Sequence, residues 1–167
     1  MTKSLYILTC VLLLLGCNRT PVIQVERQQE DPYKENMINA NKYIASSEKT
    51  QIEGYVSRHQ WNMVQLSNGV WLQEYQVGKG SKIDFEDTVT IKYHIEALNG
   101  STFYDNEEAT IVVGRQQATV GLDRALMELR HGSKARIILP SDLGYGVVGD
   151  GDRIPSRAVL IYDIQVL

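Results

Sequence analysis

The sequence contains little cysteine, histidine and proline. Only 2 cysteines, 3 histidines and 4 prolines occur among 167 residues, and both cysteines fall within the first 17 positions. Because thiols and imidazoles are the usual ligands of structural zinc and the three histidines are scattered, we expect no metal site and no cofactor. The 17 basic and 20 acidic residues give a formal net charge of -3, which provides no positive field for a phosphate backbone. We therefore expect no nucleic-acid partner.

No apolar run reaches the roughly 20 residues that a membrane-spanning helix needs, but a shorter one lies near the first residue. A cation at Lys3 precedes a mostly apolar segment that ends Leu14-Leu15-Gly16-Cys17. This order is typical of a secretory signal peptide. Its ending resembles the lipobox of bacterial lipoproteins, in which the peptide is cut before a lipid-carrying cysteine. A buried N-terminal helix or strand is the alternative, but the leucine-rich run has no polar face.

The lipobox resemblance predicts a signal peptide over residues 1–16 and a lipid on the sulfur of Cys17, which would anchor the protein to a membrane. Residues 17–32 hold this cysteine and a polar segment without helical or strand period, so we expect a flexible tether. The implied location is the periplasmic side of a bacterial cell envelope. We prefer the outer membrane because Asn18 is not an inner-membrane retention signal of the aspartate kind.

Residues 33–60 have a helical period. Apolar side chains recur at spacings of three, four and seven, at Met37, Ile38, Ala40, Ile44, Ile52, Tyr55 and Val56. The pattern predicts two short amphipathic helices, with Ser46 or Ser47 as the N-cap of the second. We expect Ile44, Ile52 and Val56 to be buried against the rest of the protein. A helix on a membrane surface is the alternative, although the segment lacks a basic face. A homodimer formed through this extension is a further expectation.

Residues 61–167 are dominated by strand patterns. The predicted strands cover residues 62–66, 70–75, 88–98, 110–114, 134–139 and 158–167, and Asn68-Gly69 is a hairpin signal between the first two. Leu122, Leu126 and Leu129 predict one helix, with Gly132 as its C-terminal cap. The fold class is therefore α+β, with a twisted, mainly antiparallel sheet of five to six strands around one short helix.

Common catalytic motifs are missing or misplaced. The sequence Gly144-Tyr-Gly-Val-Val-Gly149 fits GxGxxG, but no helix can start at the following Asp150-Gly-Asp-Arg-Ile-Pro155, which excludes a dinucleotide site. Asp150 and Asp152 are not followed by the glutamate that a calcium loop requires. No GxSxG or HExxH occurs. The function must therefore use no hydrolytic nucleophile.

The order of several short segments resembles the FKBP-type peptidyl-prolyl cis-trans isomerases over roughly residues 66–167. The matching segments are Val89-Thr-Ile-Lys-Tyr93, Asn99-Gly-Ser-Thr-Phe103, Val113-Gly114, Gly121-Leu-Asp-Arg-Ala-Leu126, Leu139-Pro-Ser-Asp-Leu-Gly-Tyr-Gly146 and Ile154-Pro-Ser-Arg-Ala-Val-Leu-Ile-Tyr-Asp-Ile164. The lipidated, helically extended chain is similar to the gliding-motility-associated lipoprotein isomerases of Bacteroidetes. The resemblance implies a sheet wrapped around a short helix, with a shallow aromatic pocket for a proline ring between them.

The resemblance also implies the site residues. It assigns catalytic roles to Tyr93, Phe103, Tyr145, Ile154 and Tyr162, and substrate-binding roles to Tyr104, Asp105, Ala118, Thr119 and Leu122. Two positions depart from the family. The pocket floor is commonly Trp and is Leu122 here. The aspartate that follows the pocket phenylalanine aligns without gaps onto Tyr104, and Asp105 replaces it only if a residue is inserted. A gap-free alignment also puts Ala109 at a position where a wall phenylalanine often sits.

The implied function is isomerisation of X-Pro bonds in proline-containing polypeptide clients, which assists protein folding in the cell envelope. The backbone N–H of Ile154 is expected to donate to the substrate carbonyl, and the Tyr145 hydroxyl to lie nearby. The alternative is an envelope binding module or chaperone with this fold and little or no isomerase activity, which the departures at Tyr104 and Leu122 favour.

Overall fold

The computed structural model describes residues 32–167. The predicted signal peptide, Cys17 and almost all of the tether lie outside the described residues. The chain divides into two compact units, Met1–Glu35 and Asn36–Leu167. Of the first unit the structure describes only the beginning of helix α2, Pro32–Arg58. Within residues 32–167, no helix combines the length and the apolar character that crossing a membrane requires.

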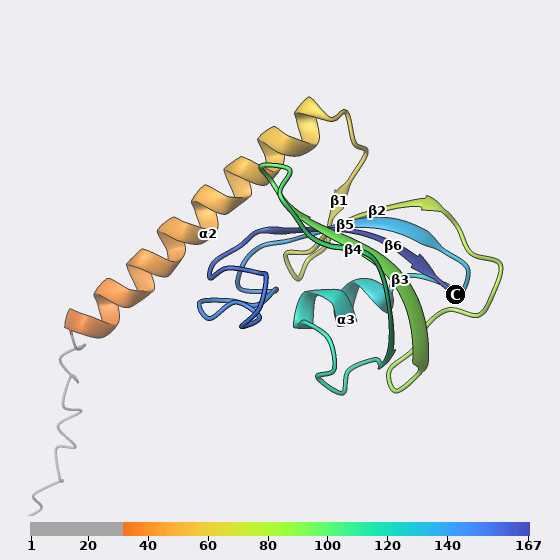
Figure 1. Cartoon of the computed structure of the whole chain (residues 1–167). Coiled ribbons are helices and arrows are strands. Elements are labelled where there is room, and N and C mark those ends of the chain that lie inside the picture. Colours follow the sequence, from red (N-terminus) through yellow and green to blue (C-terminus); the bar gives the residue numbers. More distant parts are fainter. Residues whose placement is uncertain (1–31) are drawn as a thin grey trace, which may run out of the picture. The chain divides into compact units, whose positions relative to one another are not determined.

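The second unit is built on a six-stranded antiparallel sheet. Its strands are β1 (Val64–Gln65), β2 (Trp71–Gln76), β3 (Thr88–Ala97), β4 (Thr102–Val112), β5 (Lys134–Leu139) and β6 (Leu160–Val166), in the spatial order β1-β2-β5-β6-β3-β4. Figure 1 shows the curved sheet arching over the short helix α3, Val120–Leu126. The expected fold class, an antiparallel sheet around one short helix, is confirmed.

The two central strands β5 and β6 bury side chains on both faces. On the inner face, Ile137 pairs with Tyr162 and packs in the main core together with Leu122 of α3. On the outer face, the next pair along, Ile138 and Ile161, forms a second cluster that includes residues of α2. Because successive strand side chains point to opposite faces, these neighbouring pairs support two separate hydrophobic layers.

The segment over residues 33–60 forms one continuous helix, and the prediction of two short helices is wrong. Ser46 and Ser47 lie inside α2, so neither caps a second helix, and the Ser46 carbonyl accepts a hydrogen bond from Thr50 Oγ1. No glycine or proline interrupts the sequence between Tyr33 and Glu53, and one or two serines cost a helix too little to break it.

The predicted burial of the extension is confirmed at one residue of three. Ile52 is fully buried in the second cluster, whereas Ile44 and Val56 are half-buried. Met37 and Ile38 on the same helix remain exposed, at 46% and 44%.

Two further strand and cap predictions differ from the structure. The strand predicted over residues 110–114 is the end of β4, which begins at Thr102 and pairs with β3 along its length. Its middle is polar and exposed, so it lacks the alternation that would reveal it. Gly132, with φ +86°, lies beyond the helix end and in the turn before β5, because α3 stops at Leu126 and Met127 is its C-cap.

Candidate functional site

A partly open cavity of about 180 Å³ lies between β3, β4, β6, the start of α3 and the loop that follows β5. Its lining comprises Ile91, Tyr93, Ile95, Tyr104, Ala109, Ile111, Gln117, Ala118, Thr119, Leu122, Tyr145 and Tyr162. Seven of the ten pocket residues proposed from the sequence line this one cavity. We call it the aromatic cavity. Its volume is below the roughly 300 Å³ of sites for drug-sized ligands, so it suits one small apolar group.

Strand alternation places the walls of the aromatic cavity. Ile91, Tyr93 and Ile95 of β3 lie on one face of the sheet, two residues apart. Ile95 pairs with Tyr104 on the neighbouring strand β4 and with Tyr162 on the other neighbouring strand, β6, so that one tyrosine lies on each side of it. The site is therefore assembled by three neighbouring strands whose register fixes the rings.

The first turn of α3 forms the floor. Thr119 is the N-cap of α3, and its hydroxyl oxygen accepts a 3.4 Å hydrogen bond from the N–H of Leu122. This cap starts the helix so that Leu122, 6% exposed, closes the cavity from below. Among residues 32–167, no hydrogen bond uses the N–H of Thr119 itself.

The phenols of the cavity are protonated at neutral pH, because the ordinary pKa of tyrosine is about 10 and burial raises it further. Burial raises the pKa of Tyr162, which is 2% exposed, and the neighbouring hydroxyl of Tyr145 adds to this effect. Burial also raises the pKa of Tyr145 and of Tyr93. All three side chains therefore keep an O–H group at neutral pH, and the cavity offers apolar ring surface with neutral hydrogen-bond donors.

A loop over residues 149–154 contacts Tyr104 of β4, which is a wall residue of the aromatic cavity, and we call it the mouth loop. The hydroxyl of Tyr104 donates to Oδ2 of Asp150 over 2.6 Å. The guanidinium of Arg153 lies 4.8 Å from the centroid of the Tyr104 ring and donates to the carbonyl of Phe103 over 3.4 Å. Together these contacts connect the mouth loop to one wall of the site.

The Ile154 N–H, which the sequence suggested as a donor to a substrate carbonyl, is engaged within the mouth loop. It donates to Oδ1 of Asp150 over 2.8 Å, and the same oxygen accepts the N–H of Asp152 over 2.9 Å. The side chain of Ile154 is 4% exposed and packs in the main core without lining the cavity.

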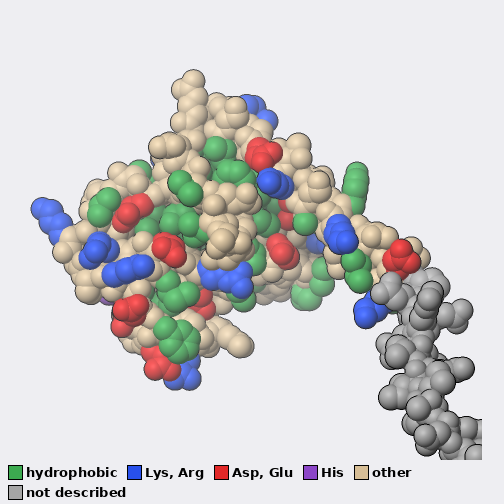
Figure 2. Space-filling model, turned by 180° about the vertical axis from the view of Figure 1, so that it is seen from behind, with side chains coloured by type: hydrophobic (Ala, Val, Ile, Leu, Met, Phe, Trp, Pro, Cys, Tyr) green, Lys and Arg blue, Asp and Glu red, His purple; other side chains and the backbone are tan. Residues whose placement is uncertain are grey.

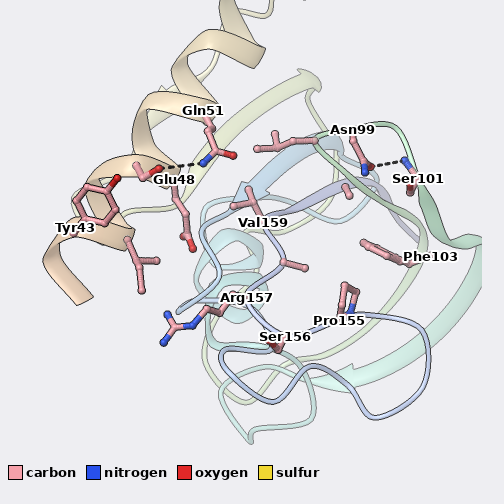
Figure 3. A pocket seen from close by; sticks show the side chains of 15 residues that line it. Tyr43, Glu48, Gln51, Asn99, Ser101, Phe103, Pro155, Ser156, Arg157 and Val159 are labelled. Atoms are coloured by element: carbon pink, nitrogen blue, oxygen red, sulfur yellow. Dashed lines mark hydrogen bonds between the residues drawn. The ribbon is translucent and has the colours of Figure 1, made fainter. Parts of the chain in front are cut away.

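Phe103 and Asp105 also lie outside the cavity lining. Phe103 packs against the main core and borders a larger groove of about 590 Å³ between α2, the β3–β4 turn and residues 155–159, as Figure 3 shows. Asp105 is exposed and its carboxylate lies 3.0 Å from Nδ1 of His94. We place the candidate site at the smaller cavity because it brings together Tyr93, Tyr104, Tyr145 and Tyr162.

Sequence reasoning did not propose the lining residues Ile91, Ile95, Ile111 and Gln117. It also missed the role of Asp150 beside the cavity, since this residue entered only as part of a rejected calcium loop. The sequence Asp150-Gly-Asp152 is typical of a turn in which an aspartate accepts backbone N–H bonds, and this signal identifies the turn. It does not reveal that Tyr104 reaches the same carboxylate.

The charged groups of the described residues are mixed in sign. Figure 2 shows Lys and Arg interspersed with Asp and Glu among hydrophobic side chains on the face in view. Within residues 32–167, no group of three or more His, Cys, Asp or Glu side chains is arranged to hold a metal ion.

Comparison with known proteins identifies relatives of the sheet and helix. A sequence model of the family described as FKBP-type peptidyl-prolyl cis-trans isomerase matches residues 79–167. Peptidyl-prolyl cis-trans isomerase FKBP9 of Homo sapiens is 39% identical over 83 residues, which are 46% of this chain and 15% of that protein. An FK506-binding protein of Neisseria meningitidis is 29% identical over 103 residues, 59% of this chain and 94% of the relative. The match thus spans a small part of the human relative and nearly all of the bacterial one.

Solved structures share the fold. A peptidyl-prolyl cis-trans isomerase from Pseudomonas syringae superposes with a TM-score of 0.64 at 24% identity, over 75% of this chain and 92% of that one. The crystal structure of AtFKBP13 superposes with a TM-score of 0.58 at 22% identity, over 62% and 95% of the two chains. Both superpositions cover nearly the whole of the solved chain.

Proposed function

Because the chain belongs to the FKBP-type peptidyl-prolyl cis-trans isomerase family, we propose that it isomerises X-Pro bonds of polypeptide clients in the aromatic cavity. The observation that carries this proposal is the convergence of Tyr93, Tyr145 and Tyr162 on one small cavity closed by Leu122. A site of this size and lining suits a single apolar ring such as that of proline.

The chemistry requires binding and no covalent step. Rotation about a peptide bond has a barrier of about 18–20 kcal/mol because nitrogen donates electrons into the carbonyl. The planar ground state is more charge-separated than the twisted transition state, so an apolar cavity that excludes water disfavours the ground state more. Interactions that are strongest with the twisted amide raise the rate.

Two hydrogen-bond donors are available for a client carbonyl at the cavity. The Tyr145 hydroxyl is protonated at neutral pH, since burial raises its pKa from an ordinary value that already lies well above 7. Thr119 lines the same cavity, and its backbone N–H has no partner among the described residues. The Ile154 N–H is a third donor only when Asp150 releases it. This arrangement makes Thr119 the backbone group best placed for a substrate.

Isomerisation of a short X-Pro peptide by the detergent-solubilised full chain tests the proposal. Exchange between the cis and trans signals of the peptide, measured by NMR, is expected to accelerate in proportion to protein concentration. The alternative function is a binding module or chaperone of this fold. If exchange is not accelerated while refolding of a proline-containing client is still assisted, the isomerase proposal is wrong and the alternative stands.

The proposal includes a place of action. We propose that the signal-peptide pattern over residues 1–16 directs export and that lipid on Cys17 anchors the protein on the periplasmic side of an envelope membrane, the outer membrane being preferred. Several acyl chains on one residue give stable anchoring. Mass spectrometry of the mature N-terminus and fractionation of a Cys17→Ser variant test this: an unmodified Cys17, or a variant that stays with the membrane, contradicts the anchor.

A dimer through the helical extension is also proposed. Its support is the exposure of Met37 and Ile38 on α2, at 46% and 44%. Sedimentation of the chain with and without residues 33–60 is expected to show loss of the dimer in the shorter form, and a monomeric full chain contradicts it.

A further inference from the structure

Helix α2 contributes an acidic side chain to the interior of the domain. Glu48 is 7% exposed and lies one turn before Ile52, which is fully buried in the second hydrophobic cluster. In Figure 3 the side chain of Glu48 leaves α2 on the side that faces the domain. A carboxylate in such a position is costly unless its oxygens are hydrogen-bonded.

Both oxygens of Glu48 bind a single residue. Oε1 accepts a 2.6 Å hydrogen bond from the hydroxyl of Ser141, and Oε2 accepts a 2.9 Å bond from the Ser141 backbone N–H. Ser141 is itself 4% exposed and lies 93 positions further along the chain. Hydrogen bonds to an ionised acceptor are roughly twice as strong as neutral ones, so this contact holds Ser141 firmly against α2.

Ser141 in turn holds the segment that carries Tyr145. Its carbonyl oxygen accepts the N–H of Gly146 over 2.8 Å and the N–H of Gly144 over 3.3 Å. The Gly146 N–H belongs to the peptide group that follows Tyr145, so this peptide group depends directly on the placement of Ser141. The Gly144 N–H is shared with the Pro140 carbonyl, which lies 3.2 Å away, and ties the backbone one residue before Tyr145 to the same turn. Tyr145 is 36% exposed, which is more than any of the other tyrosine rings of the cavity.

The same segment is anchored at the opposite side of the cavity. The N–H of Gly121 in α3 donates to the carbonyl of Leu143 over 2.9 Å. The Tyr145 segment therefore lies between two supports, one from the helix at the cavity floor and one from α2. The support from α3 fixes the segment at Leu143, and the support from Glu48 fixes it at Ser141.

We propose that Glu48 is a positioning residue of the isomerase site. Through Ser141 it holds Tyr145 in place, so that α2 contributes to turnover although it does not line the aromatic cavity. The inference rests on the proposed isomerase function. It predicts that turnover depends on a helix that lies outside residues 79–167, the part of the chain that the family model matches.

The test compares Glu48→Ala, Glu48→Gln and Glu53→Ala in the full chain. Glu48→Ala is expected to lower kcat/KM for an X-Pro peptide by about tenfold and to speed amide hydrogen exchange at Gly144 and Gly146 by at least about tenfold, since two charge-assisted bonds are lost. Glu48→Gln is expected to keep most of the turnover and most of the protection of these two amides from exchange, because its amide can accept from the Ser141 N–H and donate to the Ser141 Oγ.

Glu53→Ala is the matched control, since Glu53 lies on the same helix with a side chain 51% exposed. It is expected to change neither turnover nor exchange. Turnover per folded molecule that is unchanged in Glu48→Ala, or exchange that rises equally at all core amides, would overturn the proposal and leave Glu48 a purely structural contact. An inactive wild-type chain would instead refute the isomerase function, while the exchange at Gly144 and Gly146 would still show whether Glu48 holds the segment.

Discussion

Tyr104 on β4 donates a 2.6 Å hydrogen bond from its hydroxyl to Oδ2 of Asp150 in the mouth loop, across 46 positions of sequence. The other oxygen of Asp150 accepts the N–H groups of Asp152 and Ile154. One carboxylate therefore shapes the loop and attaches it to the cavity wall. In a gap-free alignment Tyr104 takes the position of the family's aspartate, and here its hydroxyl binds a carboxylate that comes from a different element.

The stabilisation from Asp150 is expected to depend on pH. Burial by itself raises the pKa of this carboxyl, but the hydrogen bonds from Tyr104 and the backbone outweigh it, so the pKa is lowered. A group with a lowered folded pKa stabilises the fold above its unfolded pKa, about 3.9, and loses this contribution as pH falls through the folded value. Wild type should exceed Asp150→Asn in free energy of unfolding by about 1 kcal/mol at pH 7.

Urea unfolding at pH 7 and at pH 2 measures this difference. It should be smaller at the lower pH, because it decreases as the wild-type carboxyl takes up a proton and becomes as uncharged as the amide that replaces it. Asp142→Asn, at an exposed position nearby, is the control and should change stability little at either pH. A difference between wild type and Asp150→Asn that stays constant with pH would show that the carboxylate charge is not what holds the mouth loop.

The strands with strong alternation could be predicted from the sequence. Thr88–Ala97 alternates β-branched and polar residues, and Asn68-Gly69 marks a turn that the structure closes with a hydrogen bond from the Gly69 N–H to the Leu66 carbonyl. Local pattern suffices in these cases because a strand with one buried face repeats every two residues. β4 lacks such a pattern in its polar middle and is set by pairing with β3.

The contacts that complete the site could not be predicted in the same way. Tyr104 and Asp150, and Glu48 and Ser141, are joined across 46 and 93 positions. Nothing in the spacing of these polar residues selects one partner over another, because the partners depend on how two loops and a helix pack. The ten pocket residues, by contrast, followed from the order of motifs, and seven of them line the cavity.

Tyr162 is expected to be indispensable for turnover through its ring. Its side chain is 2% exposed and forms one side of the cavity. Tyr162→Ala should abolish isomerisation and cost about 3–5 kcal/mol of stability, because it removes a large buried ring. Tyr162→Phe keeps the ring and should retain most of the turnover at a cost of about 1 kcal/mol. Peptide exchange by NMR, at a temperature where circular dichroism shows each variant folded, measures turnover.

Tyr93→Ala is the companion variant on β3, and it should also abolish turnover, with a smaller loss of stability because Tyr93 is only half-buried. Full turnover in both Tyr162→Ala and Tyr93→Ala would mean that the aromatic cavity is not where X-Pro bonds bind.

Gly149 should be irreplaceable in the mouth loop for a steric reason. Its φ is +77°, and a Cβ built there would lie 2.2 Å from the carbonyl oxygen of Ile154. Gly151 has a similar φ of +81°, but a Cβ there meets nothing within 4 Å. Both alanine variants incur the left-handed backbone cost of about 1–2 kcal/mol, and only Gly149→Ala must also displace Ile154.

The comparison of Gly149→Ala with Gly151→Ala therefore separates loop shape from backbone strain. Gly149→Ala should lower the free energy of unfolding further and should reduce turnover, because the mouth loop shifts away from Tyr104. Gly151→Ala should lower the free energy of unfolding without reducing turnover. Equal turnover in the two variants would show that the position of Ile154 and its loop has no influence on catalysis.

Ile52 is expected to make α2 unfold together with the sheet. It is fully buried among Ile138, Ile161 and Tyr55, so the outer faces of β5 and β6 are covered only while α2 is docked. Ile52→Ala should cost about 2–5 kcal/mol, whereas Ile38→Ala, at a side chain 44% exposed, should change stability by less than about 0.5 kcal/mol. Urea unfolding followed by helix circular dichroism and by tryptophan fluorescence measures both variants.

The two probes report different parts of the unit, since α2 supplies most of the helix, while Trp61 and Trp71 pack against the second cluster beside Ile52. In wild type the transitions should coincide, because neither hydrophobic layer of β5 and β6 is complete without its covering helix. A helix signal lost at lower urea than the fluorescence signal would mean that α2 undocks by itself. Glu48 could then hold Ser141 only in the docked fraction of molecules, and turnover should fall in parallel with the helix signal.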